Sequence, residues 1–326
     1  MKAKAKLIFL FLLPLYHITT LPRSCWAEAG RTAATFLSRP IGARASAMGQ
    51  AFTAVEGGID SLGYNPGALG ALARPSLSSM YSTGLSDEGF SFLGYGHPTA
   101  WGTFSAGMIY FNGGSVELNL SSGLREYRKA EQDMVEMLSY SVQIFPGFFV
   151  GLTGKLMQFK LVEQFSAKSE AVDGGILWKT PWPNLSLGGA LLNVGKEVKF
   201  EQEGDPLPKT WRVGATYSLA LRTNRSEAAE WVATAEPSIL KWVIALDEVQ
   251  VLHQSAQTHL GMELRKIPLT SSEVLANLRF GYILNRDIDS LSLGIGFEWG
   301  QLVLDYGFGL VKDLNSTHRV SVGWRF

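Results

Sequence analysis

The chain has 326 residues, equal numbers of basic (Lys+Arg 29) and acidic (Asp+Glu 29) residues, and a hydrophobic content of 46%. With no net charge, it offers no electrostatic basis for binding nucleic acid or another polyanion. Beyond the N-terminus no apolar run reaches the ~20 residues that a spanning helix needs, so insertion in a membrane would require a closed β-barrel.

The N-terminus, residues 1–29, is predicted to be a secretory signal peptide. Three lysines within the first six residues precede the apolar stretch Leu7–Ile18, which is too short to span a bilayer. The single cysteine, Cys25, falls inside this segment. Two interpretations stay open for it: a lipoprotein anchor, or a residue that is removed with the signal peptide, leaving a mature chain without a thiol.

Residues 30–74 differ from everything that follows. They are rich in small residues, which allow close backbone packing, and they end in the turn signal Asn65-Pro66-Gly67. We expect this segment to fold into the mouth of the barrel as a plug. The alternative is a periplasmic tail with one short helix near Ser46–Val55.

From Pro75 to the C-terminus the chain is predicted to form the barrel itself. The clearest strands alternate bulky apolar residues with Gly, Ser and isolated charges. They are residues 138–144, 211–219, 276–284, 291–299, 302–310 and 320–326. A soluble sandwich would carry more Lys, Glu and Thr on its polar face, so this pattern favours a transmembrane antiparallel barrel. The turn signals predict about fourteen strands, and the long, charged connection 221–239 is predicted to contain a short helix at Ser226–Ala235.

Tryptophans support this arrangement. Trp178, Trp242, Trp299 and Trp324 all fall at the predicted periplasmic ends of strands, on the apolar face. This is the position expected for an aromatic belt at the level of the lipid headgroups. The last residue is aromatic, so Trp324 and Phe326 are predicted to form the C-terminal barrel-assembly signal.

Charged residues on the polar face of the strands are predicted to line the lumen. They are Lys155, Arg212, Glu263, Arg279, Glu298, Asp305 and Arg319. Either they select a solute, or they pair with one another and fill a narrow barrel. The register places Asp305 and Arg319 opposite each other around a loop near Lys312.

Enzyme and metal motifs are missing from the sequence. None of the five histidines has metal-ligand spacing to another His or to Cys, and no nucleophile elbow, phosphate loop or dinucleotide fingerprint occurs. We therefore expect a protein that is not an enzyme and that holds no metal and no cofactor.

Several short motifs resemble the PorV/PorQ family of outer-membrane proteins, relatives of the FadL long-chain fatty-acid transporters. In the N-terminal segment they are Gly42-Ala43-Arg44-Ala45, Met48-Gly49-Gln50-Ala51-Phe52, Asp60 and Asn65-Pro66-Gly67-Ala68-Leu69. In the strands they are residues 206–214, 259–263, 304–306 and 317–319. The resemblance implies a fourteen-stranded barrel with an N-terminal plug that contains Gly42, Arg44, Met48, Gly49, Asp60, Asn65 and Pro66.

Two functions follow from the resemblance. The first is a PorV-type role in type IX secretion, in which loops 112–132 and 194–208 bind secreted proteins or secretion components. The second is FadL-like passage of a hydrophobic small molecule, which apolar residues on the lumen face would favour. The lumen-facing positions of the strands named above carry mostly Gly, Ser and charged residues, which favours the PorV-type role. Both place the chain in the outer membrane of a Gram-negative-type bacterium, with lipid and the barrel-assembly machinery as partners.

Overall fold

The computed structural model describes residues 32–83, 87–119, 125–200, 203–221, 240–269, 274–286, 291–310 and 316–326. The predicted signal peptide, Cys25, the predicted helix at Ser226–Ala235 and Lys312 lie outside these ranges. The predictions made for them stay predictions.

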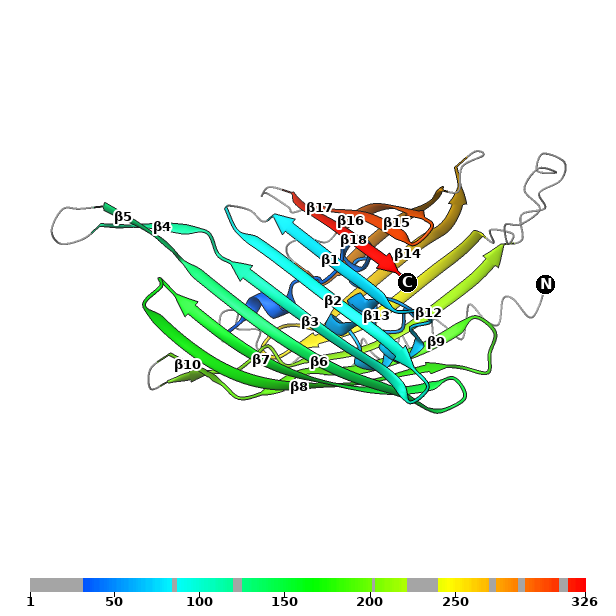
Figure 1. The fold of residues 1–326 in the computed structure, drawn as a ribbon, viewed down its shortest axis with the longest axis horizontal. Coiled ribbons are helices and arrows are strands. Elements are labelled where there is room, and N and C mark those ends of the chain that lie inside the picture. The colour runs from blue at the N-terminus through cyan, green and yellow to red at the C-terminus, as the bar shows by residue number, and fades with distance from the viewer. Residues whose placement is uncertain are drawn as a thin grey trace.

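Fourteen antiparallel strands form a closed barrel that leaves no free edge (Figure 1). The strands are β1 (Ser76–Thr83), β2 (Gly89–Thr99), β3 (Gly102–Asn112), β6 (Glu131–Phe145), β7 (Phe148–Leu161), β8 (Phe165–Lys179), β9 (Leu185–Gly195), β12 (Thr210–Leu221), β13 (Leu240–Val251), β14 (Gln257–Pro268), β15 (Val274–Leu284), β16 (Leu291–Trp299), β17 (Leu302–Leu310) and β18 (Thr317–Arg325). Pairing of β1 with β18 closes the sheet. The predicted fold class, an antiparallel barrel of about fourteen strands, is confirmed.

Alternation along each strand separates an outward face from an inward one. In β16, Leu293, Ile295 and Phe297 point outward and are exposed, whereas Ser292 and Glu298 point inward and are buried. An outward band of bulky apolar side chains is stable only against acyl chains. No helix in the described ranges has the length and apolar character needed to cross a bilayer.

The two ends of the barrel differ. At one end, here called the turn end, most strands are joined by short connections such as Gly300, with the connection from β12 to β13 as a long exception, and the C-terminus lies there (Figure 1). At the other, the loop end, β3 and β6 are joined through the hairpin of β4 (Ser115–Asn119) and β5 (Arg125–Lys129), which projects beyond the barrel. A second hairpin there, β10 (Val198–Lys199) with β11 (Gly204–Asp205), joins β9 to β12.

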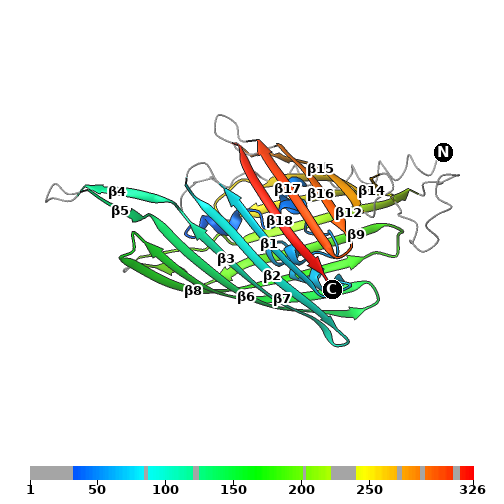
Figure 2. The ribbon, with the colours of Figure 1, turned by 45° about the horizontal axis from the view of Figure 1, so that its top comes forward.

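The N-terminal segment, residues 32–72, lies inside the barrel (Figure 2). It contains four short helices, η1 (Thr35–Ser38), α2 (Ala43–Ala47), η2 (Ile59–Gly63) and η3 (Pro66–Ala71). Helix α2 packs against β15–β18 on one side of the lumen, and η3 packs against β6–β9 on the other. We call residues 32–72 the inner segment; the division of the chain at residues 29/30 and 74/75 stays a prediction.

Candidate functional site

The lumen has two walls of opposite chemistry. The apolar wall is the loop-end half of the first five barrel strands. Its buried, inward-facing apolar side chains are Met80, Phe90, Phe92, Ile109, Phe111, Val135, Met137, Met157 and Phe159. The charged wall is formed by β12–β18. Its buried, inward-facing ionisable side chains are Arg212, Asp247, His259, Glu263, Arg279, Glu298, Asp305 and Arg319.

The apolar wall overturns the expectation that the lumen face is mostly Gly, Ser and charge. That expectation holds for most of β12–β18 and for the turn-end half of β6, where Ser139 and Ser141 point inward. It fails for β13, where Val243, Ala245 and Val249 share the inward face with Asp247. It is wrong for β2, where Phe90 and Phe92 point inward while Leu93 and Tyr95 are exposed outside. Both faces of β2 are therefore apolar there, and the polar alternation is lost.

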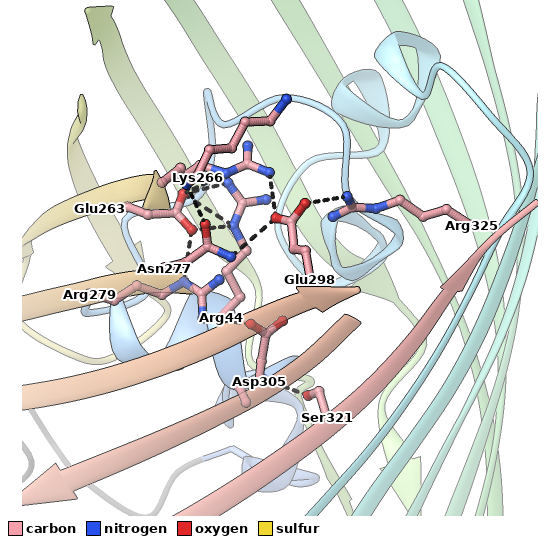
Figure 3. A network of polar contacts seen from close by, with 11 residues as sticks. Arg44, Glu263, Lys266, Asn277, Arg279, Glu298, Asp305, Ser321 and Arg325 are labelled. Atoms are coloured by element: carbon pink, nitrogen blue, oxygen red, sulfur yellow. Dashed lines mark hydrogen bonds and ion pairs between the residues drawn. The ribbon is translucent and has the colours of Figure 1, made fainter. Parts of the chain in front are cut away.

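The charged wall holds the inner segment through an ion network (Figure 3). The guanidinium of Arg44, from α2, donates to both oxygens of Glu263, with an Nη2–Oε2 distance of 2.7 Å. Arg279 joins Glu263 (2.8 Å) to Asp305 (2.6 Å). Because Glu263 has a fully buried side chain, these guanidinium groups replace the water that its charge would otherwise require.

The same network continues toward the turn end (Figure 3). Glu298 accepts from Arg265 (3.3 Å), Arg325 (3.0 Å) and the Asn277 side-chain amide (3.1 Å). Here the structure corrects one predicted pair. Asp305 lies opposite Ser321, not Arg319, because the hairpin register is shifted by two residues. Arg319 instead donates to the Ser46 hydroxyl of the inner segment at 3.0 Å.

A second set of bonds fixes the middle of the inner segment. The carboxylate of Asp247 accepts from the backbone N–H groups of Phe52 and Thr53, both at 2.9 Å, and pairs with Arg212 at 3.1 Å. Arg212 also donates to the carbonyl of Gln50 at 2.6 Å. A turn with no regular structure of its own is thereby held in place by two wall residues.

Asn65 and Pro66 form the start of η3. The Asn65 side-chain oxygen accepts from the Gly67 N–H (2.9 Å), which is a helix N-cap, and Pro66 occupies the first turn. The side-chain amide of Asn65 donates to the carbonyls of Thr53 (2.7 Å) and Ile176 (2.8 Å). This one side chain therefore links two turns of the inner segment to β8.

Inward-facing glycines in the strands seat the inner segment, a role that the sequence reasoning missed. A Cβ at Gly261 would lie 2.6 Å from the carbonyl oxygen of Met48, and a Cβ at Gly281 would collide with the backbone of Gly49. Gly151 and Gly175 leave the corresponding room for Pro66 and Asn65. The usable signal was a glycine at an inward position in several neighbouring strands, since bare backbone permits close approach.

Lys155 lies apart from the charged wall, at the border with the apolar wall. Its ammonium pairs with Asp173 (2.7 Å) and donates to the Asn193 side chain (2.6 Å), and the Asn193 N–H donates to Asp173 (2.7 Å). The β8–β9 register shifts here between Val172 and Gly174. These bonds close on one another and hold an irregularity in the sheet.

Asp60 joins the inner segment to β1. It accepts from the Ser78 hydroxyl at 3.2 Å, and it lies against Gly42, whose φ of 82° is left-handed. Burial and the charge of Asp305 raise the pKa of the Asp60 carboxyl to about 6, although Ser78, Arg44 and Arg279 act in the opposite direction.

Two cavities lie at the loop end, against the first part of the inner segment. The larger, about 230 Å³, is lined by polar groups including Arg39, Glu88 and Arg319. The smaller, about 90 Å³, is lined by Leu37, Tyr64, Val249, His259 and other residues. Ser38 and Arg39 line both, so η1 is bordered by open space.

All seven charged residues predicted to line the lumen are buried and point inward, and most are paired with another residue of the wall or the inner segment. Trp324 and Phe326 are exposed at the turn end; their role in assembly stays a prediction.

Among the described residues, no group of three or more His, Cys, Asp or Glu side chains is placed to hold a metal ion.

Comparison with known proteins supports the fold. No family model and no curated protein matches the chain. The Pseudomonas putida toluene transporter TodX has a similar structure, with 13% identity over 86% of this chain and 96% of that one, at a TM-score of 0.53. The monoaromatic hydrocarbon channel CymD gives 11% identity, 88% and 97% coverage and a TM-score of 0.53.

A Pseudomonas aeruginosa FadL homologue is also similar, with 10% identity, 91% and 100% coverage and a TM-score of 0.50. At these identities the similarity shows the barrel fold alone and leaves the chemistry of this lumen to its own residues. The resemblance to PorV/PorQ is not shown by these comparisons and stays a prediction.

Proposed function

We propose that this chain is an outer-membrane channel for the passage of hydrophobic small molecules. The observation that carries the proposal is the apolar wall, whose nine inward side chains run from the middle of the barrel to the loop end. A lumen built only for ions or water would expose polar groups there. The FadL-like fold, shared with a toluene transporter and a monoaromatic hydrocarbon channel, supports the same function.

The inner segment acts in this proposal as a plug that opens on one side. Charged and backbone hydrogen bonds hold Arg44, Gln50 and Thr53 against the charged wall. Against the middle of the apolar wall the same segment presents Ile59 and Leu62, which make non-directional apolar contacts. A hydrophobic solute replaces such contacts at little cost, so the route runs between the plug and the apolar wall.

We also propose a location and partners. The outward apolar band supports a location in the outer membrane with lipid as the solvent, and the exposed C-terminal Trp324 and Phe326 are the proposed signal for the barrel-assembly machinery. The chain has no proposed enzymatic activity. A secretion role for loops 112–132 and 194–208 ranks second, because the polar lumen that favoured it is limited to part of the barrel.

Uptake in cells tests the proposal. A strain that lacks the chain should accumulate a radiolabelled aromatic hydrocarbon several-fold more slowly than the parent strain, while secreted proteins leave the cell normally. Met157→Gln, which places an amide on the apolar wall, should reduce uptake at an unchanged amount of barrel, because a passing hydrocarbon cannot satisfy that amide. Thr216→Val, an inward substitution on β12, is the matched control and should leave uptake unchanged.

Equal uptake by the two strains would contradict the proposal. Retention of secreted proteins together with normal uptake would favour the secretion role instead.

A further inference from the structure

The imidazole of His259 lines the smaller loop-end cavity and has one nitrogen without a partner. His259 lies near the loop end of β14 and is 2% exposed. Its Nδ1 lies 2.7 Å from the carbonyl oxygen of Gly49, in the inner segment. Its Nε2 is buried and has no hydrogen-bond partner among the described residues. A buried polar atom in this state is costly unless something in the cavity bonds to it.

The bond to Gly49 decides which partner Nε2 requires. A carbonyl oxygen only accepts, so Nδ1 carries the proton, and Nε2 of the neutral imidazole presents a lone pair. The neutral form is favoured because the guanidinium groups of Arg39, Arg212 and Arg286 line the same cavity. Nε2 is therefore a hydrogen-bond acceptor that requires an O–H or N–H donor.

Other buried polar groups of the cavity wall already have partners within the protein. Arg212 pairs with Asp247 at 3.1 Å, and the Tyr64 hydroxyl donates to the carbonyl of Ile41 at 3.1 Å. Within the part of the wall that the structure describes, His259 alone has a buried side-chain atom that lacks a partner. The unmet hydrogen bond of this cavity is therefore concentrated at one nitrogen.

Much of the remaining wall is apolar. Leu192 of β9 and Val249 and Val251 of β13 are buried there, and Leu37 of η1 also lines the cavity. Water can donate to Nε2, but it leaves these side chains against a polar molecule. A solute with an apolar body and one hydroxyl group matches both parts of the wall.

The size of the cavity limits what fits beside Nε2. Its volume is about 90 Å³, which corresponds to about three waters in the liquid. It adjoins the larger cavity, because both are lined by Ser38, Arg39, Gln50 and Arg286. A hydroxyl group and the atoms next to it fit at His259, and a longer solute extends into the adjoining space.

We propose that this cavity binds a neutral solute through a hydroxyl group, as in a phenol, whose O–H donates to Nε2 of His259. The lining includes three arginines and, among the described residues, no carboxylate, which disfavours a cationic ligand. The site lies against β9 and β12–β14, away from the apolar wall. Binding depends on the cavity alone. Only the further claim that such solutes are carried across the membrane rests on the proposed function.

Imidazole NMR of the full-length barrel in phospholipid nanodiscs tests the contact directly. Histidine is labelled with ¹⁵N, and the His259 signals are assigned by their absence from His259→Asn. The probes are phenol and toluene, which differ by a hydroxyl in place of a methyl group. Phenol should shift the Nε2 resonance of His259 in a saturable way. The resonances of His318, whose exposed ring bonds to Tyr306, should not move.

The affinities of both probes show whether the hydroxyl is recognised. They are measured by saturation-transfer difference NMR against empty nanodiscs. The wild type should bind phenol about tenfold tighter than toluene, because toluene leaves Nε2 without a donor. His259→Asn keeps an amide that can donate to Gly49 but has no atom in the place of Nε2, so it should bind the two probes equally. His318→Asn is the matched control and should keep the full preference.

A second variant keeps His259 and removes the space. Val249→Phe places a larger apolar side chain in the cavity, so phenol should no longer shift the Nε2 resonance. This variant tests the site even if His259→Asn folds poorly.

Three results would overturn the proposal. They are a His259 resonance that phenol leaves unchanged, which would show that the cavity holds water only, a phenol preference that survives His259→Asn, or a phenol shift that survives Val249→Phe. Transport is a separate outcome. If phenol binds as expected but enters cells equally fast with and without the chain, the channel function fails and the binding site stands.

Discussion

The apolar wall and the charged wall hold the same inner segment by different physics. On the charged wall, Arg44, Thr53 and Ser46 each have a partner of fixed geometry in Glu263, Asp247 and Arg319. On the apolar wall, most contacts depend on buried area and not on direction, with the Gly42 N–H bond to the Met80 sulfur (3.1 Å) as a directional exception. One wall therefore fixes the position of the segment, and in the proposed function the other is the wall where a hydrophobic solute takes the place of the segment.

This difference sets the free-energy cost of opening a route along each wall. Moving the segment off the charged wall would leave buried charges without partners. Moving it off the apolar wall would expose apolar surface that a hydrophobic solute covers again. The predictions below either separate the two walls or show that they are equivalent. Each is measured by urea-induced unfolding of the barrel in phospholipid vesicles, followed by tryptophan fluorescence.

The largest effect is expected from removing the centre of the ion network. Glu263→Ala leaves Arg44, Arg279 and Arg265 near one another without their shared carboxylate, and should lower the free energy of unfolding by about 3–5 kcal/mol. Ser292→Ala, on the same wall, loses one hydroxyl bond to Gly49 and should cost about 1 kcal/mol. Similar losses from both would show that the network does not anchor the segment.

The next comparison uses substitutions that keep size or charge. Arg279→Lys keeps the charge but cannot reach Glu263 and Asp305 together, so it should cost about 2–3 kcal/mol. Met137→Leu on the apolar wall keeps the volume and should cost less than about 1.5 kcal/mol. If the order were reversed, the apolar wall would be the one that demands exact geometry.

The sequence predicted the charged wall better than the apolar one, for a physical reason. Strands such as 291–299 and 302–310 were recognised because small or charged residues alternate with large apolar ones. That criterion selects strands whose inward face is polar. At Phe90–Tyr95 both faces are apolar, so periodicity cannot show which side faces the lumen. A lumen inferred only from strands with a polar inward face is expected to be polar, whatever the remaining strands contribute.

Ion partners were harder to predict than burial. Arg44 was identified by a motif, but its pairing with Glu263 joins residues 219 positions apart and depends on how the inner segment folds. A register error of two residues likewise assigned Asp305 the wrong partner, since hairpin pairing follows the turn and residues 311–315 carry no strong turn signal.

Asn65 tests the junction between the two walls. Asn65→Ala removes the cap of η3 and leaves the carbonyls of Thr53 and Ile176 without their donor, which should cost about 1–2 kcal/mol. Asn65→Asp restores the cap acceptor alone and should recover only part of the loss. Full recovery by Asp would mean that the bonds to Thr53 and Ile176 contribute nothing measurable.

The smallest expected effect is a pH dependence at Asp60, where the inner segment meets β1 beside both walls. Its pKa in the folded protein, about 6, lies above the ordinary aspartate value of 3.8, so the folded state binds more protons between these values. Stability from this group therefore rises as the pH falls through that window, and between pH 7 and pH 5 the gain should be about 1 kcal/mol.

Other carboxylates titrate in the same range, so the informative quantity is the difference between the wild type and Asp60→Asn. Asparagine keeps the shape and can still accept from Ser78, but it has no proton to gain. The wild type should therefore become more stable relative to Asp60→Asn as the pH falls from 7 to 5. A constant difference would show that water reaches this carboxyl from the apolar side, and that the segment is less tightly seated there than on the charged wall.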